Sequence, residues 1–112
     1  MKANINTTFG KREVAIEASY KYKGMDIFLT IEGSYTVASE WKTGCRITSV
    51  DVLGNRKAKI SSIVEKTNAV LDIAEARGSI AHSIEKMVEK HGVANEGEMP
   101  LIGDVVIAEV SK

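Results

Sequence analysis

The spacing of apolar residues changes once along the chain, near residue 57, and this change limits the possible folds most strongly. Before it, apolar side chains tend to recur at every second position, which is the period of a strand with one buried face. After it, they recur every three or four positions, which is the period of an amphipathic helix. A strand-like half followed by a helical half predicts an α+β fold in which the helical face covers a sheet.

Two runs in the first half show the strand period clearly. Residues 12–22 have one apolar face, made by Val14, Ile16, Ala18, Tyr20 and Tyr22. Residues 25–35 follow with Ile27, Leu29 and Ile31 on one face. Because only Lys23 and Gly24 join the two runs, we predict that they pair as an antiparallel hairpin.

The rest of the strand-like half is less regular. Residues 45–53 predict a third strand, whose apolar residues fall on both parities and so indicate a bulge or burial on both faces. Residues 36–44 are interpreted as the hairpin connection before it, with the alternative that Thr36 and Val37 extend the strand over residues 25–35. Residues 4–9 are a candidate for one more strand at the edge of the sheet.

The helical half divides at a glycine. One apolar stripe runs along residues 57–77 at Ile60, Ile63, Val64, Thr67, Leu71 and Ala74. A second follows at Ile80, Ile84, Met87 and Val88. A glycine inside a helix costs about 1 kcal/mol relative to alanine, so Gly78 predicts two helices in place of one long rod. Asn55 is the expected cap at the start, and Gly92 the expected end.

The C-terminal part completes the predicted architecture. Residues 93–103 contain two glycines and the only proline, Pro100, and predict a loop, whereas the apolar run 104–110 predicts a strand buried on both faces. We therefore expect one domain over residues 1–112. Its fold would be α+β, with a two-layer, mostly antiparallel sheet of three to five strands packed against one or two α-helices, in the order β-β-β-α-α-β.

Composition narrows the class of protein. Fifteen basic residues balance fifteen acidic ones, which disfavours a strongly basic nucleic-acid binder and an acidic DNA mimic. The single cysteine, Cys45, excludes an internal disulfide and is expected to be a reduced thiol in a cytoplasmic protein. No stretch has the apolar length needed to span a membrane.

The zero net charge hides an uneven distribution. Residues 1–59 carry ten basic and six acidic residues, whereas residues 60–112 carry five and nine. All six aromatic residues precede residue 42. Strand preference alone accounts for the aromatic bias, because aromatic residues favour strands. A recognition surface on the strand half is the alternative.

Motifs for metal, nucleotide or acid–base chemistry are missing from the sequence. No Cys-x-x-Cys or His-x-x-x-His pair gives the spacing of a zinc site. His82, Glu85 and Glu89 share a helical face, which we interpret as a solvated face with lysine partners. No glycine-rich phosphate loop occurs, so no cofactor is predicted. Cys45 with His82 or His91 leaves a small cysteine enzyme as a third hypothesis, against the simpler interpretation of a packed thiol.

Surface recognition is the function that the sequence favours. Tyrosines and Trp41 alternate with lysines and arginines along the strand half, a composition found on protein interfaces and on single-stranded nucleic-acid binders. Interspersed glutamates favour protein binding over nucleic-acid binding. Trp41 could be exposed at an interface or folded back to cap the sheet edge.

The functional prediction is a non-enzymatic protein–protein interaction module that binds through a flat, exposed face of its sheet. The residues predicted to contact the partner are Trp41, Tyr35, Lys42 and Arg46. A small accessory or inhibitor-type protein, including the phage type, fits this size, and a homodimer is one form it could take. The alternative is a single-stranded nucleic-acid-binding protein that uses the basic, aromatic half.

Overall fold

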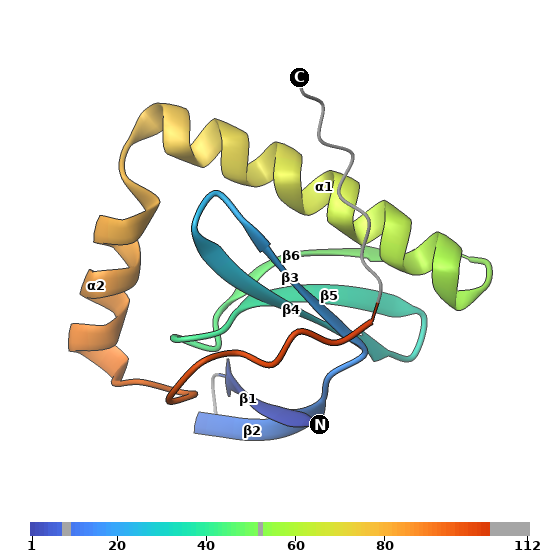
Figure 1. The fold of residues 1–112 in the computed structure, drawn as a ribbon, viewed down its shortest axis with the longest axis horizontal. Coiled ribbons are helices and arrows are strands. Elements are labelled where there is room, and N and C mark those ends of the chain that lie inside the picture. The colour runs from blue at the N-terminus through green and yellow to red at the C-terminus, as the bar shows by residue number, and fades with distance from the viewer. Residues whose placement is uncertain (8–9, 52, 104–112) are drawn as a thin grey trace.

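The computed structural model describes residues 1–7, 10–51 and 53–103, and in this part of the chain six strands precede two helices (Figure 1). A two-stranded antiparallel sheet pairs β1 with β2, and a four-stranded antiparallel sheet has the order β3-β4-β5-β6. The strands are β1 Lys2–Thr7, β2 Gly10–Ala15, β3 Ala18–Tyr22, β4 Met25–Glu32, β5 Tyr35–Glu40 and β6 Arg46–Asp51. The helices are α1 Arg56–Arg77 and α2 Ile80–His91. The α+β class is therefore confirmed, although more strands precede the helices than the predicted order allowed.

The predicted strand over residues 12–22 is wrong, because two strands of different sheets share this run. The Ile16 amide donates to the Met1 carbonyl at 2.9 Å, and the next amide, Glu17, donates to the Leu29 carbonyl at 2.8 Å. The chain therefore crosses from the small sheet to the large one between these residues. The alternating pattern continues through the crossing, since both strands bury the same parity.

The predicted connection over residues 36–44 is also wrong, because β5 occupies most of it. β4 ends at Glu32, a turn follows at Gly33 with φ +62°, and β5 then pairs with both β4 and β6. Thr36, Val37, Ala38 and Ser39 are all buried. A strand buried on both faces has no alternation to detect, so its small residues resembled a connection.

Four local predictions are confirmed. The Asn55 side chain accepts a hydrogen bond from the Ala58 amide at 2.9 Å and caps α1. Gly78 separates α1 from α2, and Gly92 ends α2. The irregularity expected in the third strand lies in its pairing, where the register between β5 and β6 shifts at Ala38 and Ser39.

One face of the four-stranded sheet packs against the helices. Ile27 and Leu29 of β4 lie fully buried there, against Ile63 and Leu71 of α1. α2 contributes Ile80 and Ile84 to the edge of this core, and both are only partly buried. The two helices meet at a steep angle, so that α1 lies across the sheet while α2 flanks its end (Figure 1).

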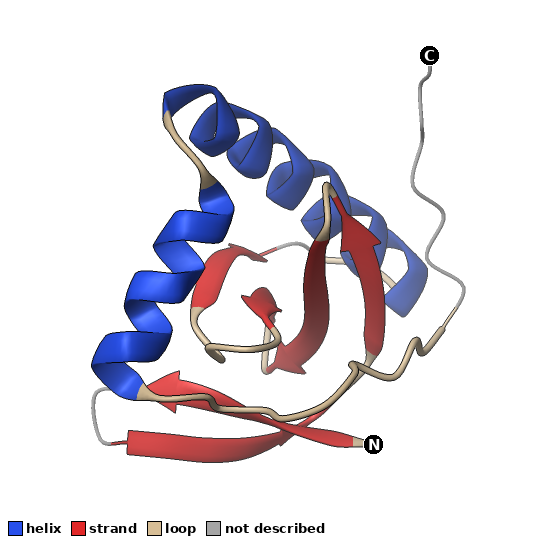
Figure 2. Ribbon diagram, turned by 60° about the vertical axis from the view of Figure 1, so that its left-hand side comes forward, coloured by secondary structure: helices blue, strands red, loops and turns tan. Residues whose placement is uncertain are grey.

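The other face of this sheet is covered too, so the expectation of a flat exposed sheet face is wrong for the described residues. The β1–β2 hairpin and residues 93–103, here called the strap, lie over it (Figure 2). Ala3, Ile16, Phe28, Trp41 and Met99 form a second core beneath them. The sheet therefore lies between two covering layers, where a two-layer fold was predicted.

The strap has no regular secondary structure, as predicted, and side-chain hydrogen bonds tie it to the segments that it covers. Asn95 accepts from the Asn4 amide at 2.7 Å and donates to the carbonyls of Asn4 and Trp41 at 2.9 and 2.7 Å. At the far end, the Ser19 amide donates to the Ile102 carbonyl, and the Ile102 amide donates to the Ser19 hydroxyl. The strand predicted over residues 104–110 lies outside the described residues.

Gly44 provides a test of this packing. Its φ is +68°, and an added Cβ would lie 2.7 Å from the Asn4 carbonyl oxygen and 2.9 Å from the Ala94 Cβ. We expect Gly44→Ala to lower the free energy of unfolding by about 2–4 kcal/mol, since backbone strain and overpacking add. Gly24→Ala is the control: φ is +78° but the space is open, so strain alone should cost about 1–2 kcal/mol. Equal losses in urea denaturation would contradict the close packing of β1, the strap and the 41–45 turn.

Candidate functional site

The four residues predicted to contact a partner lie at two ends of the sheet. Trp41 and Lys42 follow the end of β5, and Arg46 pairs with Ser39 near that end. Tyr35 begins β5, and six steps at about 3.3 Å per residue place it roughly 20 Å from Trp41. Trp41, Lys42 and Arg46 are therefore brought together, and Tyr35 is not.

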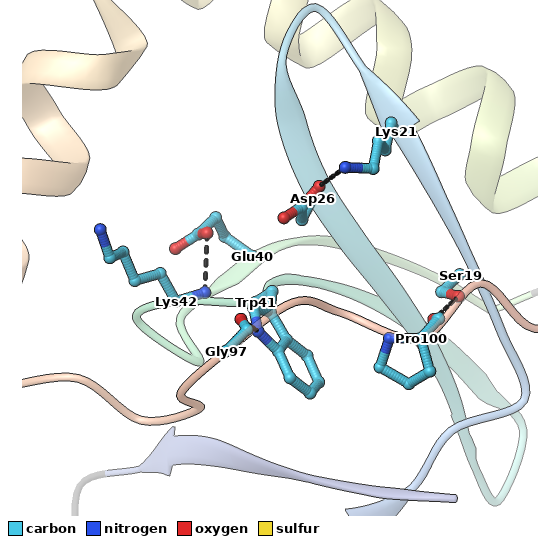
Figure 3. A network of polar contacts seen from close by, with 8 residues as sticks. All are labelled: Ser19, Lys21, Asp26, Glu40, Trp41, Lys42, Gly97 and Pro100. Carbon is cyan, nitrogen blue, oxygen red and sulfur yellow. Dashed lines mark hydrogen bonds and ion pairs between the residues drawn. The ribbon is translucent and has the colours of Figure 1, made fainter.

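Trp41 is folded inward, which is the second of the two placements considered for it. Its side chain is buried in the second core, with the indole edge-on to the Phe28 ring at 6.0 Å between centroids. The indole Nε1 donates to the Gly97 carbonyl at 3.0 Å (Figure 3). Trp41 thus holds the strap to the sheet, while Lys42 and Arg46 beside it are exposed.

A cleft of about 480 Å³ opens at the same end of the sheet. It lies between the β3–β4 turn, the end of β5, α2 and the beginning of the strap. Its apolar lining comes from Met25, Ile84 and Val93, together with Trp41. No residue of α2 is fully buried, so this helix covers the cleft without sealing it.

Glu40 is the most deeply buried charged group of the cleft. Its two carboxylate oxygens accept hydrogen bonds from the amides of Lys42 and Thr43, each at 2.8 Å. Figure 3 shows the bond from the Lys42 amide. The turn from β5 to β6 is therefore closed by this side chain. The carboxylate is held in place by two rigid backbone donors, and such bonds offset the cost of burying a charge.

The β3–β4 turn, which forms one wall of the cleft, is tied to α1. Asp72 accepts a hydrogen bond from the Tyr22 hydroxyl at 2.8 Å and pairs with the Lys23 ammonium at 2.7 Å. Lys21 pairs with Asp26 across the hairpin at 3.3 Å (Figure 3). The hydrogen bonds from Lys23 and Tyr22 lower the pKa of Asp72, and the hydrogen bond to Asp72 raises the pKa of Lys23.

The opposite end of the sheet is apolar and exposed. Tyr35 is 52% exposed, and Leu53, two residues beyond β6, is 89% exposed. Leu101 of the strap, next to β3, and Met1, next to Ile16, are 66% and 74% exposed. Figure 1 shows the β4–β5 turn and the start of α1 on its right-hand side. Sequence reasoning missed Leu53 because it extended the third strand to this residue.

The described residues bring few aromatic and basic groups together for stacking with nucleic acid. Tyr20 is buried, its hydroxyl donating to Asn68, and burial raises its pKa far above the ordinary value. The Tyr22 hydroxyl is bonded to Asp72, and Trp41 is buried. Among the three tyrosines and Trp41, Tyr35 is therefore the exposed residue. Ion pairs with acidic residues engage five basic residues, namely Lys2, Arg12, Lys21, Lys23 and Arg56.

The groups considered for catalysis or metal binding come from the turn before β6 and from α2. Cys45 is half-buried, and its thiol contacts the Thr43 carbonyl at 3.9 Å. His82 and His91 belong to α2, and both are exposed. Within the described residues, no group of three or more His, Cys, Asp and Glu side chains is arranged to hold a metal ion.

Comparisons with known proteins add no functional information. The sequence matches no protein-family model, and no match was found among curated proteins or solved structures. Neither described helix has the combination of length and apolar character that crossing a membrane requires.

The Asp72 contacts predict how stability depends on pH. The pKa of Asp72 is lowered from its ordinary value of 3.8. Its contribution to the stability of the fold is therefore fully present above pH 3.8 and is lost as the pH falls through the lowered pKa. The raised pKa of Lys23 acts in the opposite direction, so that its contribution is lost at alkaline pH. We expect Asp72→Asn to be less stable than the wild type at neutral pH, with the gap closing in acid.

Urea denaturation across the acid range measures this difference. Asp51→Asn is the matched control, because Asp51 is exposed and has no ion pair among the described residues. A gap between Asp72→Asn and the wild type that is independent of pH would contradict an electrostatic role for Asp72.

Proposed function

We propose that this protein is a non-enzymatic protein-interaction module and that its partner binds the apolar end of the sheet. The observation that carries the proposal is the exposure of Tyr35 and Leu53 at this one end, where Tyr35 pairs with Asp51 of β6 and Leu53 follows two residues later. Large apolar side chains gathered on a surface are costly to leave in water, and such patches commonly mark binding sites. Of the residues predicted from the sequence, Tyr35 belongs to this end.

Charged groups around the apolar end support an interface. Arg12 pairs with Glu32 beside the β4–β5 turn, and Arg56 pairs with Glu17 beside the start of α1, with Nε to Oε1 at 3.2 Å. Protein interfaces commonly combine an apolar centre, in which aromatic residues such as Tyr are enriched, with a polar rim, and Arg is enriched in them as well. The Arg12 and Arg56 pairs would form this rim and would orient a partner.

The type of partner follows from the chemistry of this surface. An apolar centre with paired charges suits another folded protein better than a polyanion, which needs unpaired basic residues. A small accessory or inhibitor-type role in the cytoplasm remains part of the proposal. A second copy of the chain is one possible partner, and single-stranded nucleic acid is the alternative that a binding test would identify.

The test compares two variants with substitutions at exposed apolar residues. Tyr35→Glu combined with Leu53→Glu places charges at the proposed interface, and Ile73→Glu places one on the outer side of α1, where Ile73 is 57% exposed. Proteins that co-purify with each tagged variant would be quantified by mass spectrometry, and the affinity of any candidate would then be measured with purified components. We expect the double variant to bind at least about tenfold more weakly, because two interface anchors are lost.

The comparison of the double variant with Ile73→Glu shows whether a loss of binding is specific to the apolar end. A partner retained by Ile73→Glu and lost by the double variant supports the proposal. If the double variant, folded as judged by circular dichroism, binds every partner as the wild type does, the apolar end is not the interface. Sedimentation of the same proteins separates self-association from binding to another protein, since only self-association changes the mass of the isolated chain.

A further inference from the structure

The cleft beside α2 lies at the opposite end of the sheet from the proposed interface, and the interface does not use it. Its volume of about 480 Å³ accommodates a side chain or a small ligand. Met25 and Val93 line it together with Ile84 from α2. The site is thus an open groove with apolar walls, formed by four separate segments of the chain.

The charges that line the cleft are mostly negative. Asp26, Glu40 and Glu96 contribute three carboxylates, against one ammonium from Lys42. Glu40 is held by two backbone amides and has a fixed position. Glu96 is exposed on the strap and has no ion pair among the described residues. A ligand that enters beside the apolar walls therefore meets a net negative potential, which favours a cation.

The negative charge of the cleft is only partly neutralised by Lys21 and Lys42. Lys21 lies 3.3 Å from one oxygen of Asp26, a distance and exposure typical of a weak surface ion pair. Lys42 uses its backbone amide to hold Glu40, while its side chain extends away from the sheet (Figure 3). An incoming cation can therefore share Asp26 with Lys21, or can displace Lys21 at a small cost in free energy.

We propose that the cleft between α2 and the end of the sheet binds an arginine side chain presented by a peptide or protein. The methylene groups of arginine would pack against Met25, Ile84 and Val93. The guanidinium, which is always charged and suited to bidentate contact with carboxylates, would face Asp26 and Glu96. The site is independent of the partner proposed for the apolar end.

The probe is N-acetyl-arginine methylamide, with the citrulline analogue as its neutral match in shape. Binding to the wild-type protein would be followed by amide chemical shifts and by the fluorescence of Trp41, the only tryptophan, whose indole is bonded to Gly97 of the cleft. We expect the arginine probe to shift the amides of the β3–β4 turn, α2 and the start of the strap. The citrulline probe should bind about tenfold more weakly, as loss of a charged hydrogen bond predicts.

Substitutions then test the carboxylates. Asp26→Asn and Glu96→Gln preserve shape and remove charge, and each should weaken binding of the arginine probe severalfold. Glu98→Gln is the matched control, because Glu98 is an exposed residue of the same strap that does not line the cleft. Salt should weaken binding of the arginine probe and leave the citrulline probe unchanged.

Three results would overturn the proposal. The first is equal binding of the arginine and citrulline probes, and the second is amide shifts confined to other surfaces. The third is stronger binding of the glutamate analogue, N-acetyl-glutamate methylamide, which would assign the cleft to an anion held by Lys42. None of these results bears on the Tyr35 and Leu53 variants, so the two proposals fail separately.

Discussion

The attachment of the strap to the sheet is the constraint on which the rest of the structure depends. A four-stranded sheet with apolar residues on both faces must be covered twice, and α1 covers only one face. The second cover is a segment without helix or strand, whose backbone groups would be costly to bury unpaired. The side chains of Asn4, Ser19 and Trp41 pair with these backbone groups, and Asn95 of the strap bonds in turn to the backbone of Asn4 and Trp41.

This arrangement leaves the two ends of the sheet as the available surfaces. The strap begins beside α2 and ends beside β3, so it crosses the whole of the face that would otherwise be free (Figure 1). At its start it forms part of the cleft lined by acidic and apolar groups, and at its end it presents Leu101 to solvent. The chemical difference between the ends follows from the residues that the strap and the turns bring to each.

Sequence reasoning succeeded where a local interaction decides the conformation. The Asn55 cap, the division of the helices at Gly78 and the short Lys23–Gly24 link each depend on residues close in the chain. It failed at β5, because Thr36, Val37, Ala38 and Ser39 are buried on both faces and give no periodic signal. It also failed at Ile16 and Glu17, where an unbroken alternation conceals a crossing between two sheets.

The sequence by itself determined the class of the fold and the extent of both helices, since hydrophobic periodicity and capping are properties of short stretches of chain. Only the tertiary structure decided that Trp41 is buried, that Tyr35 lies at the other end of the sheet from Lys42 and Arg46, and that the sheet has no open face among the described residues. The burial of a side chain depends on segments far away in the sequence. For Trp41 these are Gly97 and Met99, and no local sequence pattern specifies that tertiary contact.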